Sequence, residues 1–80
     1  MTFWVYILES LKNGRRYIGT SSNPKKRLEQ HNLGKTRSTK PYIPYKIIHL
    51  EKFETKKQAL IRERKLKSYK GGEALKKLIK

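Results

Sequence analysis

The fold of this chain is decided by residues 3–20, FWVYILESLKNGRRYIGT. The run over residues 3–8 is apolar and aromatic without interruption, which is typical of a strand covered on both faces of a sheet. Asn13 followed by Gly14 is typical of a two-residue hairpin turn, and residues 16–20 have the composition of a returning strand. The stretch therefore predicts an antiparallel hairpin whose first strand is central in its sheet.

The alternation of side chains along a strand predicts which residues of this hairpin share a face. A loop two residues longer or shorter leaves the faces unchanged, because successive side chains point to opposite sides. One face is predicted to carry Tyr6, Leu8, Tyr17, Gly19 and Ser21. The missing side chain of Gly19 would let the two tyrosines approach the strand closely. Ordinary packing is the alternative explanation of the tyrosine pair.

The rest of the chain supplies the helices and a third strand. Asn23 before Pro24 is a typical helix start, and Thr55 with Gln58 has the spacing of a capping box. The expected elements are a helix over 24–32, a loop over 35–44, a strand over 45–53 with Ile47, Ile48 and Leu50 as its core, a helix from 56 to about 70, and a short helix over 73–80. The order β-β-α-β-α-α predicts one α+β domain over residues 1–80, a small antiparallel-dominated three-stranded sheet flanked by helices.

The charge balance favours a polyanionic partner. The chain has 21 Lys and Arg residues against six acidic ones, a formal net charge of +15 at pH 7, and such a density repels itself. Nucleic acid is the first candidate partner, and a basic surface that serves only solubility is the alternative. No apolar run of membrane-spanning length and no signal-like N-terminus is present. We therefore expect a cytoplasmic protein with no membrane partner.

The residue types also limit the chemistry of any metal site. The chain has no cysteine and only two histidines, which excludes disulfides and ordinary structural zinc sites. All six acidic residues are glutamates, so a metal ion would have to be held by very few carboxylates.

Glu63 is the carboxylate predicted to face inward. A step of about 100° per residue places it on the same stripe of its helix as Ala59 and Leu66. A buried carboxylate needs a cationic partner, which would be Arg62, Arg64, another base or a metal ion. A salt bridge on the helix surface is the alternative.

Arg27 and His31 are the other chemically notable pair. They are four residues apart and project from one side of the helix over 24–32. A solvated helix face is the alternative explanation in such a basic chain.

In their order and spacing, these residues resemble the GIY-YIG nuclease family. The resemblance rests on Trp4-Val5-Tyr6, Tyr17-Ile18-Gly19, Arg27, His31 and Glu63, and it runs from about Phe3 to Lys67. The chain is similar in particular to small stand-alone bacterial members, which are related to the incision domain of the excision-repair nuclease. The first triplet keeps only its tyrosine. No asparagine follows Glu63, whereas many catalytic members carry one there.

The resemblance implies a metal-dependent endonuclease that hydrolyses DNA phosphodiester bonds in DNA repair or processing, with selectivity for DNA structure. Glu63 would bind one Mg²⁺ or Mn²⁺, and a single glutamate suffices because magnesium keeps several waters. Arg27 would hold the scissile phosphate through its fixed fork. Tyr6 would orient or deprotonate the attacking water, and Tyr17 or His31 would assist through hydrogen bonds or proton exchange.

A set of basic residues is expected to follow the nucleic-acid backbone. These residues are Lys25, Lys26, Lys35, Arg37 and Lys40. DNA is the expected partner and RNA the alternative. The family's usual targeting domains are absent, which leaves the substrate open, and a protein partner is one candidate for targeting. The missing asparagine favours a second hypothesis, a basic DNA- or RNA-binding module that keeps the nuclease fold without catalysis. A small ribosome-associated or structural protein is a third.

Overall fold

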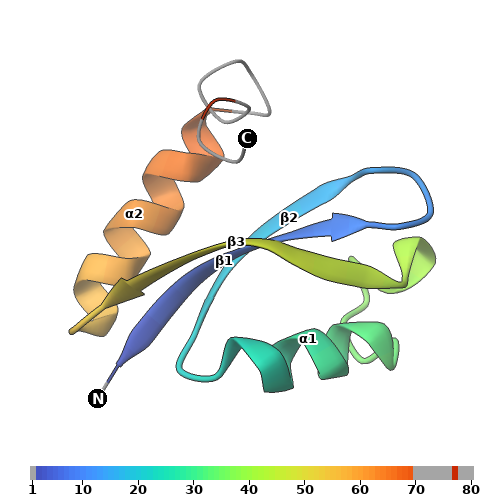
Figure 1. Cartoon of the computed structure of the whole chain (residues 1–80), viewed down its shortest axis with the longest axis horizontal. Helices are drawn as coiled ribbons and strands as arrows, with labels where there is room; N and C mark the ends of the chain where they lie inside the picture. Colours follow the sequence, from blue (N-terminus) through green and yellow to red (C-terminus); the bar gives the residue numbers. More distant parts are fainter. Residues whose placement is uncertain (1, 70–76, 78–80) are drawn as a thin grey trace.

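The computed structural model describes residues 2–69 and residue 77, and in this part the expected order of strands and helices is confirmed (Figure 1). The elements are β1 (Phe3–Ser10), β2 (Arg16–Ser21), α1 (Pro24–Asn32), the short 3-10 helix η1 (Lys40–Tyr42), β3 (Tyr45–Phe53) and α2 (Lys56–Ser68). The strands form one antiparallel sheet in the order β2-β1-β3. The α+β architecture with a three-stranded sheet is therefore as predicted, and η1 lies within the expected loop. The expected helix over 73–80 lies outside the described residues, apart from Lys77.

The central strand β1 is buried because helices cover both faces of the sheet. Val5 and Ile7 point to the α2 face, where they pack against Ala59 and Leu66. Tyr6 and Leu8, which alternate with them along β1, point to the α1 face. Figure 1 shows α1 and α2 on opposite sides of the sheet. The unbroken apolar run of β1 is thus explained by its place between two layers. None of the helices that the structure describes is long and apolar enough to cross a membrane.

The hairpin loop is longer than predicted, and the register shifts by two residues. Ser10 N donates to Arg15 O at 2.7 Å, so the connection is wider than Asn13 and Gly14 alone. The Ser10 hydroxyl accepts from the backbone N–H groups of Lys12 and Asn13, which closes the wider turn. Gly14 then takes a φ of +76° at its end. The predicted face survives because a shift of two preserves alternation: Tyr6 pairs with Gly19 and Leu8 with Tyr17.

The predicted helix caps form, and the predicted core of β3 is partly wrong. Asn23 Oδ1 accepts from Lys26 N at 3.1 Å, and Thr55 Oγ1 accepts from Gln58 N at 3.2 Å. Helix α2 ends at Ser68, slightly before the expected end. A β-bulge opposite Ile7 and Leu8 shifts the register of β3. Ile47 and Ile48 pack against opposite cores, whereas Leu50 lies 45% exposed.

Asn32 fixes the end of α1 to the start of β3. Its Oδ1 accepts from Tyr45 N at 2.7 Å, and its Nδ2 donates to Tyr45 O at 3.1 Å. The Asn32 side chain thereby forms hydrogen bonds with both the backbone N–H and the backbone C=O of Tyr45. In an edge strand these groups would otherwise need another partner. This contact holds the helix that carries Arg27 and His31 against the sheet.

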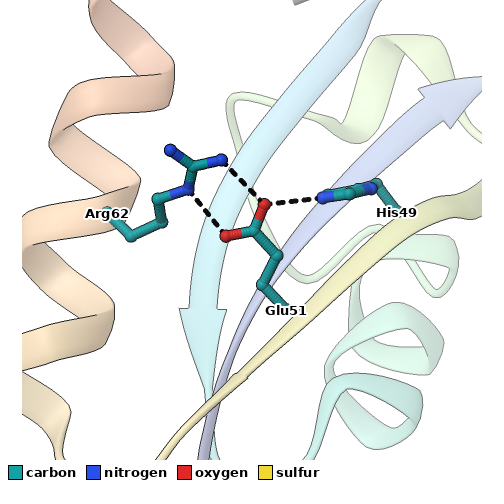
Figure 2. Close-up of polar contacts among 3 residues, drawn as sticks. All are labelled: His49, Glu51 and Arg62. Carbon is teal, nitrogen blue, oxygen red and sulfur yellow. Dashed lines mark hydrogen bonds and ion pairs between the residues drawn. The ribbon is translucent and has the colours of Figure 1, made fainter. Parts of the chain in front are cut away.

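On the other face, an ion pair ties α2 to β3 (Figure 2). Arg62 donates through Nε to Glu51 Oε1 at 2.7 Å and through Nη2 to Glu51 Oε2 at 3.0 Å. His49 Nε2 lies 2.8 Å from Glu51 Oε2. The hydrogen bonds from Arg62, helped by those from His49, lower the pKa of Glu51 although burial opposes them. Two-point contact between a guanidinium and a carboxylate fixes orientation as well as distance.

Replacing Glu51 should therefore destabilise the fold in a pH-dependent way. We expect Glu51→Gln to lower the free energy of unfolding by about 1–2 kcal/mol at pH 7, because the charged hydrogen bonds to Arg62 are weakened. A carboxyl whose folded pKa is lowered stabilises above its unfolded pKa, and this contribution disappears as the pH falls through the folded value. Urea unfolding at pH 7 and pH 3 should show the difference shrinking at pH 3. The exposed Glu54→Gln variant is the control, and an equal loss for Glu51→Gln at both pH values would contradict this assignment.

The Tyr6 ring occupies space that a side chain at residue 19 would need. A β-carbon built on Gly19 would lie 2.5 Å from Tyr6 Cζ and 3.1 Å from Tyr17 Cε2. We expect Gly19→Ala to cost about 1–3 kcal/mol through overpacking and to displace both rings, visible as shifts of their aromatic NMR resonances. Gly14→Ala is the matched control: it meets open space at a positive φ, so it should cost about 1 kcal/mol and leave the rings in place. Unchanged Tyr6 resonances in Gly19→Ala would refute the close approach.

Candidate active site

Three aromatic side chains of the predicted site gather on the α1 face of the sheet. Tyr6 comes from the central strand, Tyr17 from the edge strand β2, and His31 from α1. Their ring centroids are 6.3 Å apart for Tyr6 and Tyr17, 6.3 Å for Tyr6 and His31, and 4.9 Å for Tyr17 and His31. Residues far apart in sequence thus form one cluster.

His31 is fully buried within this cluster. Its Nε2 lies 3.4 Å from the Tyr6 hydroxyl, and its Nδ1 lies 2.9 Å from Thr39 Oγ1. Burial lowers the pKa of His31, and the charge of Arg27 lowers it further. The imidazole is therefore neutral near pH 7, with one nitrogen able to accept a hydrogen bond. A solvated helix face, the alternative drawn from the sequence, does not hold for His31.

The Tyr6 hydroxyl lies within the influence of two opposite charges. Burial is the largest effect and raises the pKa of Tyr6, while hydrogen bonding with Arg27 and the charge of Arg27 lower it. The charges of Tyr17 and Glu63 raise it. Tyr6 is therefore a neutral phenol at physiological pH, and its hydroxyl lies 3.4 Å from His31 Nε2 of α1.

Arg27 lines an open pocket at the start of α1. Ser21, Ser22, Asn23, Lys26 and Gln30 are the other lining residues, around a volume of about 260 Å³. The Arg27 guanidinium donates through Nη1 to Gln30 Oε1 at 3.0 Å, which orients it within the pocket. The two cationic side chains that line this pocket, Lys26 and Arg27, make a suitable environment for a phosphate.

Glu63 reaches the edge strand β2 from the opposite face. Its Oε1 accepts from Thr20 Oγ1 at 2.8 Å, and its Oε2 pairs with Lys67 Nζ at 3.3 Å. Among the partners expected for Glu63, the one found is another base, Lys67, whereas Arg62 binds Glu51. Glu63 is also not the one inward carboxylate, since the Glu51 side chain has the same exposed fraction, 19%.

The donor set around Glu63 fits one hydrated divalent ion. Among residues 2–69 and 77, no group of three or more acidic or histidine side chains could enclose a metal. Magnesium keeps most of its waters and commonly takes one or two carboxylates, so Glu63 can serve as its protein ligand. A site for zinc or calcium would need more ligands than this part of the chain offers.

The predicted nucleic-acid-binding residues lie along α1 and the segment after it. All five are exposed: Lys25, Lys26, Lys35, Arg37 and Lys40. Lys25 and Lys26 begin α1, and Lys40 approaches its far end, where a β-carbon on Gly34 would meet the Lys40 side chain at 3.4 Å. Two of the charges thus lie at the start of α1, and the other three lie in the segment after it.

Two hydroxyl residues of the site were not predicted from the sequence. Thr20 contacts Glu63 across 43 positions of sequence, and Thr39 contacts His31 from the segment before η1. Alternation places Thr20 on the α2 face, opposite to Gly19, but no local pattern indicates its partner. Thr39 is among the residues that share the family resemblance, but no local pattern indicates its contact with His31.

Known proteins resemble this chain over most of its length. The model of the GIY-YIG catalytic domain matches residues 2–75. A UPF0213 protein of Syntrophus aciditrophicus is 39% identical over 74 residues, covering 90% of this chain and 84% of that protein. A UPF0213 protein of Haloquadratum walsbyi is 34% identical over 67 residues, covering 82% and 74%.

A solved structure has the same fold. The solution NMR structure of a UPF0213 protein from Bacillus halodurans matches with a TM-score of 0.51 and 29% identity, covering 94% of this chain and 92% of that one. The ordered residues of the site, the sheet that carries them and the match over residues 2–75 agree. The chain therefore belongs to the GIY-YIG catalytic domain family.

Proposed function

We propose that this protein is a metal-dependent endonuclease that hydrolyses DNA phosphodiester bonds, selects DNA by its structure and acts in DNA repair or processing. The observation that supports it most is the surroundings of the Tyr6 hydroxyl. Tyr17, His31 and Arg27 lie around it on the α1 face, and the charge of Glu63 reaches it from α2. Family membership supports nuclease chemistry in general.

Arg27 would bind the scissile phosphate in the open pocket at the start of α1. A guanidinium donates two parallel hydrogen bonds to phosphoryl oxygens and keeps its charge at every physiological pH. Gln30 holds this group in place through the 3.0 Å contact with Nη1. Positive charge at the reacting phosphate stabilises the negative charge that develops on its oxygens.

Tyr6 would orient the attacking water and accept its proton as the new bond to phosphorus forms. A free phenolate is unfavourable because burial raises the pKa of Tyr6, so the phenol must lose its own proton as it gains one. His31, neutral and 3.4 Å away, and Tyr17, beside both rings, are the groups that could assist.

Glu63 would hold one Mg²⁺ or Mn²⁺ on the edge of β2. When bound, this ion supplies positive charge to the phosphoryl and leaving oxygens. Thr20 orients the carboxylate by donating to Oε1, and the weak pair with Lys67 leaves Oε2 accessible. The chain's own groups thus offer binding, water orientation and charge at one edge of the sheet.

Replacing Glu63 should separate catalysis from folding. With Mg²⁺ or Mn²⁺, the wild-type protein is expected to nick supercoiled plasmid, and Glu63→Gln should slow nicking by about a hundredfold or more because the ion loses its carboxylate ligand. Thermal unfolding should show the variant folded. Glu54→Gln changes an exposed glutamate and should nick like wild type. Nicking that persists in Glu63→Gln, or in the presence of EDTA, would argue against this site.

Binding should depend steeply on salt. If about six phosphates are neutralised, duplex affinity should fall about a thousandfold between 50 and 200 mM salt. Replacing both Lys25 and Lys26 by Gln should reduce the slope of log affinity against log salt by about two, measured by fluorescence anisotropy in EDTA. Lys57→Gln, an exposed lysine on α2, is the control. An unchanged slope in the double variant would remove these lysines from the interface.

A second candidate function is a DNA- or RNA-binding module without catalysis, favoured by the absence of an asparagine after Glu63. A Mn²⁺ titration followed by NMR distinguishes the two. Line broadening around Glu63 and Thr20 is expected for a working site, whereas salt-sensitive binding of branched, nicked and single-stranded substrates without broadening or cleavage would favour the module.

A further inference from the structure

A chain of buried polar contacts runs from Tyr6 through His31 to Thr39. The Tyr6 hydroxyl lies 3.4 Å from His31 Nε2, and His31 Nδ1 lies 2.9 Å from Thr39 Oγ1. Thr39 Oγ1 in turn lies 3.3 Å from the carbonyl oxygen of Thr36. Tyr6, His31 and Thr39 are each at most 2% exposed, so the two contacts that join them are shielded from bulk solvent.

The backbone fixes Thr39 independently of His31. Thr39 N and Lys40 N both donate to Thr36 O, at 3.1 and 3.0 Å, and Tyr42 N donates to Thr39 O at 3.0 Å. This hydrogen-bonded turn leads directly into η1. The Thr39 hydroxyl is therefore presented to the imidazole by a rigid segment and does not depend on the rotamer of His31.

Counting hydrogens along the chain distinguishes the two tautomers of His31. The Thr39 hydroxyl has one hydrogen. If it donates to His31 Nδ1, its contact with Thr36 O has no hydrogen and His31 Nε2 must point its own at Tyr6. If it donates to Thr36 O, as a third donor beside the N–H groups of Thr39 and Lys40, then Nδ1–H donates to Thr39 and Nε2 accepts from Tyr6, and each of the three contacts contains one hydrogen.

We propose that Thr39 is a positioning residue that holds His31 in the tautomer with Nδ1 protonated, so that Nε2 accepts the hydrogen of the Tyr6 hydroxyl. The geometry of Tyr6, His31, Thr39 and Thr36 supports this without reference to activity. Its catalytic consequence rests on the proposed function.

The consequence is a defined path for the proton of the attacking water. As the water oxygen bonds to phosphorus, its proton passes to Tyr6 Oη and the phenolic proton passes to His31 Nε2. The bond from phosphorus to the leaving oxygen breaks, and that oxygen keeps the electron pair and takes a proton from solvent. After cleavage the proton returns through Tyr6 to solvent, which restores both side chains.

Substrate binding would favour this path. The Arg27 charge opposes a second positive charge on His31, and a phosphate bound to Arg27 offsets that repulsion. His31 would therefore accept the proton more readily when the substrate is present. The opposite tautomer would direct an N–H toward Tyr6 and leave the phenolic proton without this acceptor.

The tautomer can be measured directly on the full-length protein. Two-bond ¹H–¹⁵N NMR spectra distinguish protonated from unprotonated ring nitrogens, and a His49→Gln variant assigns the two histidines. We expect His31 to show a protonated Nδ1 and an unprotonated Nε2. A protonated Nε2 in the wild-type protein would overturn the proposal even if the protein cleaves DNA. Absence of cleavage together with the expected tautomer would count against the proposed function alone.

Variants of Thr39 test whether it is the cause. Thr39→Val keeps the shape without the hydroxyl, and we expect averaged His31 ring shifts from both tautomers and nicking slower by about tenfold or more. Thr39→Ser should restore both the shifts and the rate. Thr36→Ala, which keeps the carbonyl, is the matched control. A wild-type tautomer in Thr39→Val would refute the role of Thr39, and if that variant fails to fold, the wild-type and Thr39→Ser spectra still decide the tautomer.

Discussion

Tyr6 packs its ring against Gly19 on the neighbouring strand, in space that a β-carbon would occupy. This close approach lets a side chain from the centre of the sheet extend over the edge strand β2. Its hydroxyl then meets His31 and lies within the influence of Arg27. The antiparallel register that pairs Tyr6 with Gly19 is therefore the constraint on which the candidate site depends. A shift of β2 by one residue would turn Gly19 to the α2 face and place a residue with a side chain opposite Tyr6.

Two adjacent residues of β2, Gly19 and Thr20, contact side chains of the candidate site on opposite faces of the sheet. Gly19 faces α1 and admits Tyr6, while Thr20 faces α2 and donates to Glu63. Because β2 is an edge strand in the sheet, groups from both faces can approach each other around it. Under the proposed function, Arg27 on one side and Glu63 on the other would act on the same bond, although the sheet separates their helices.

The sequence reveals what is local and misses what depends on distant contacts. The helix starts at Asn23 and Thr55 follow from neighbouring residues, and the shared face of Tyr6 and Tyr17 survives an error in loop length because alternation has a period of two. The register itself depends on how the Ser10 hydroxyl closes the turn. Leu50, expected in the core, lies 45% exposed, and its exposure depends on tertiary packing that no local pattern reveals. The partners of Glu63 and His31 come from segments that no spacing rule connects.

The two carboxylates on the α2 side explain why Glu63 is the better candidate for a metal ligand. Both side chains are 19% exposed, so burial does not distinguish them. Both oxygens of Glu51 are occupied by the Arg62 fork, and His49 adds a further contact (Figure 2).

Glu63 instead accepts from a neutral hydroxyl and pairs with a lysine whose side chain is 55% exposed. An exposed pair four residues apart on a helix contributes only about 0.3–0.5 kcal/mol, so a divalent ion could displace it at little cost. Displacing Arg62 from Glu51 would instead leave a guanidinium without its partner between α2 and β3. The arrangement thus gives one carboxylate to the fold and leaves the other available for chemistry.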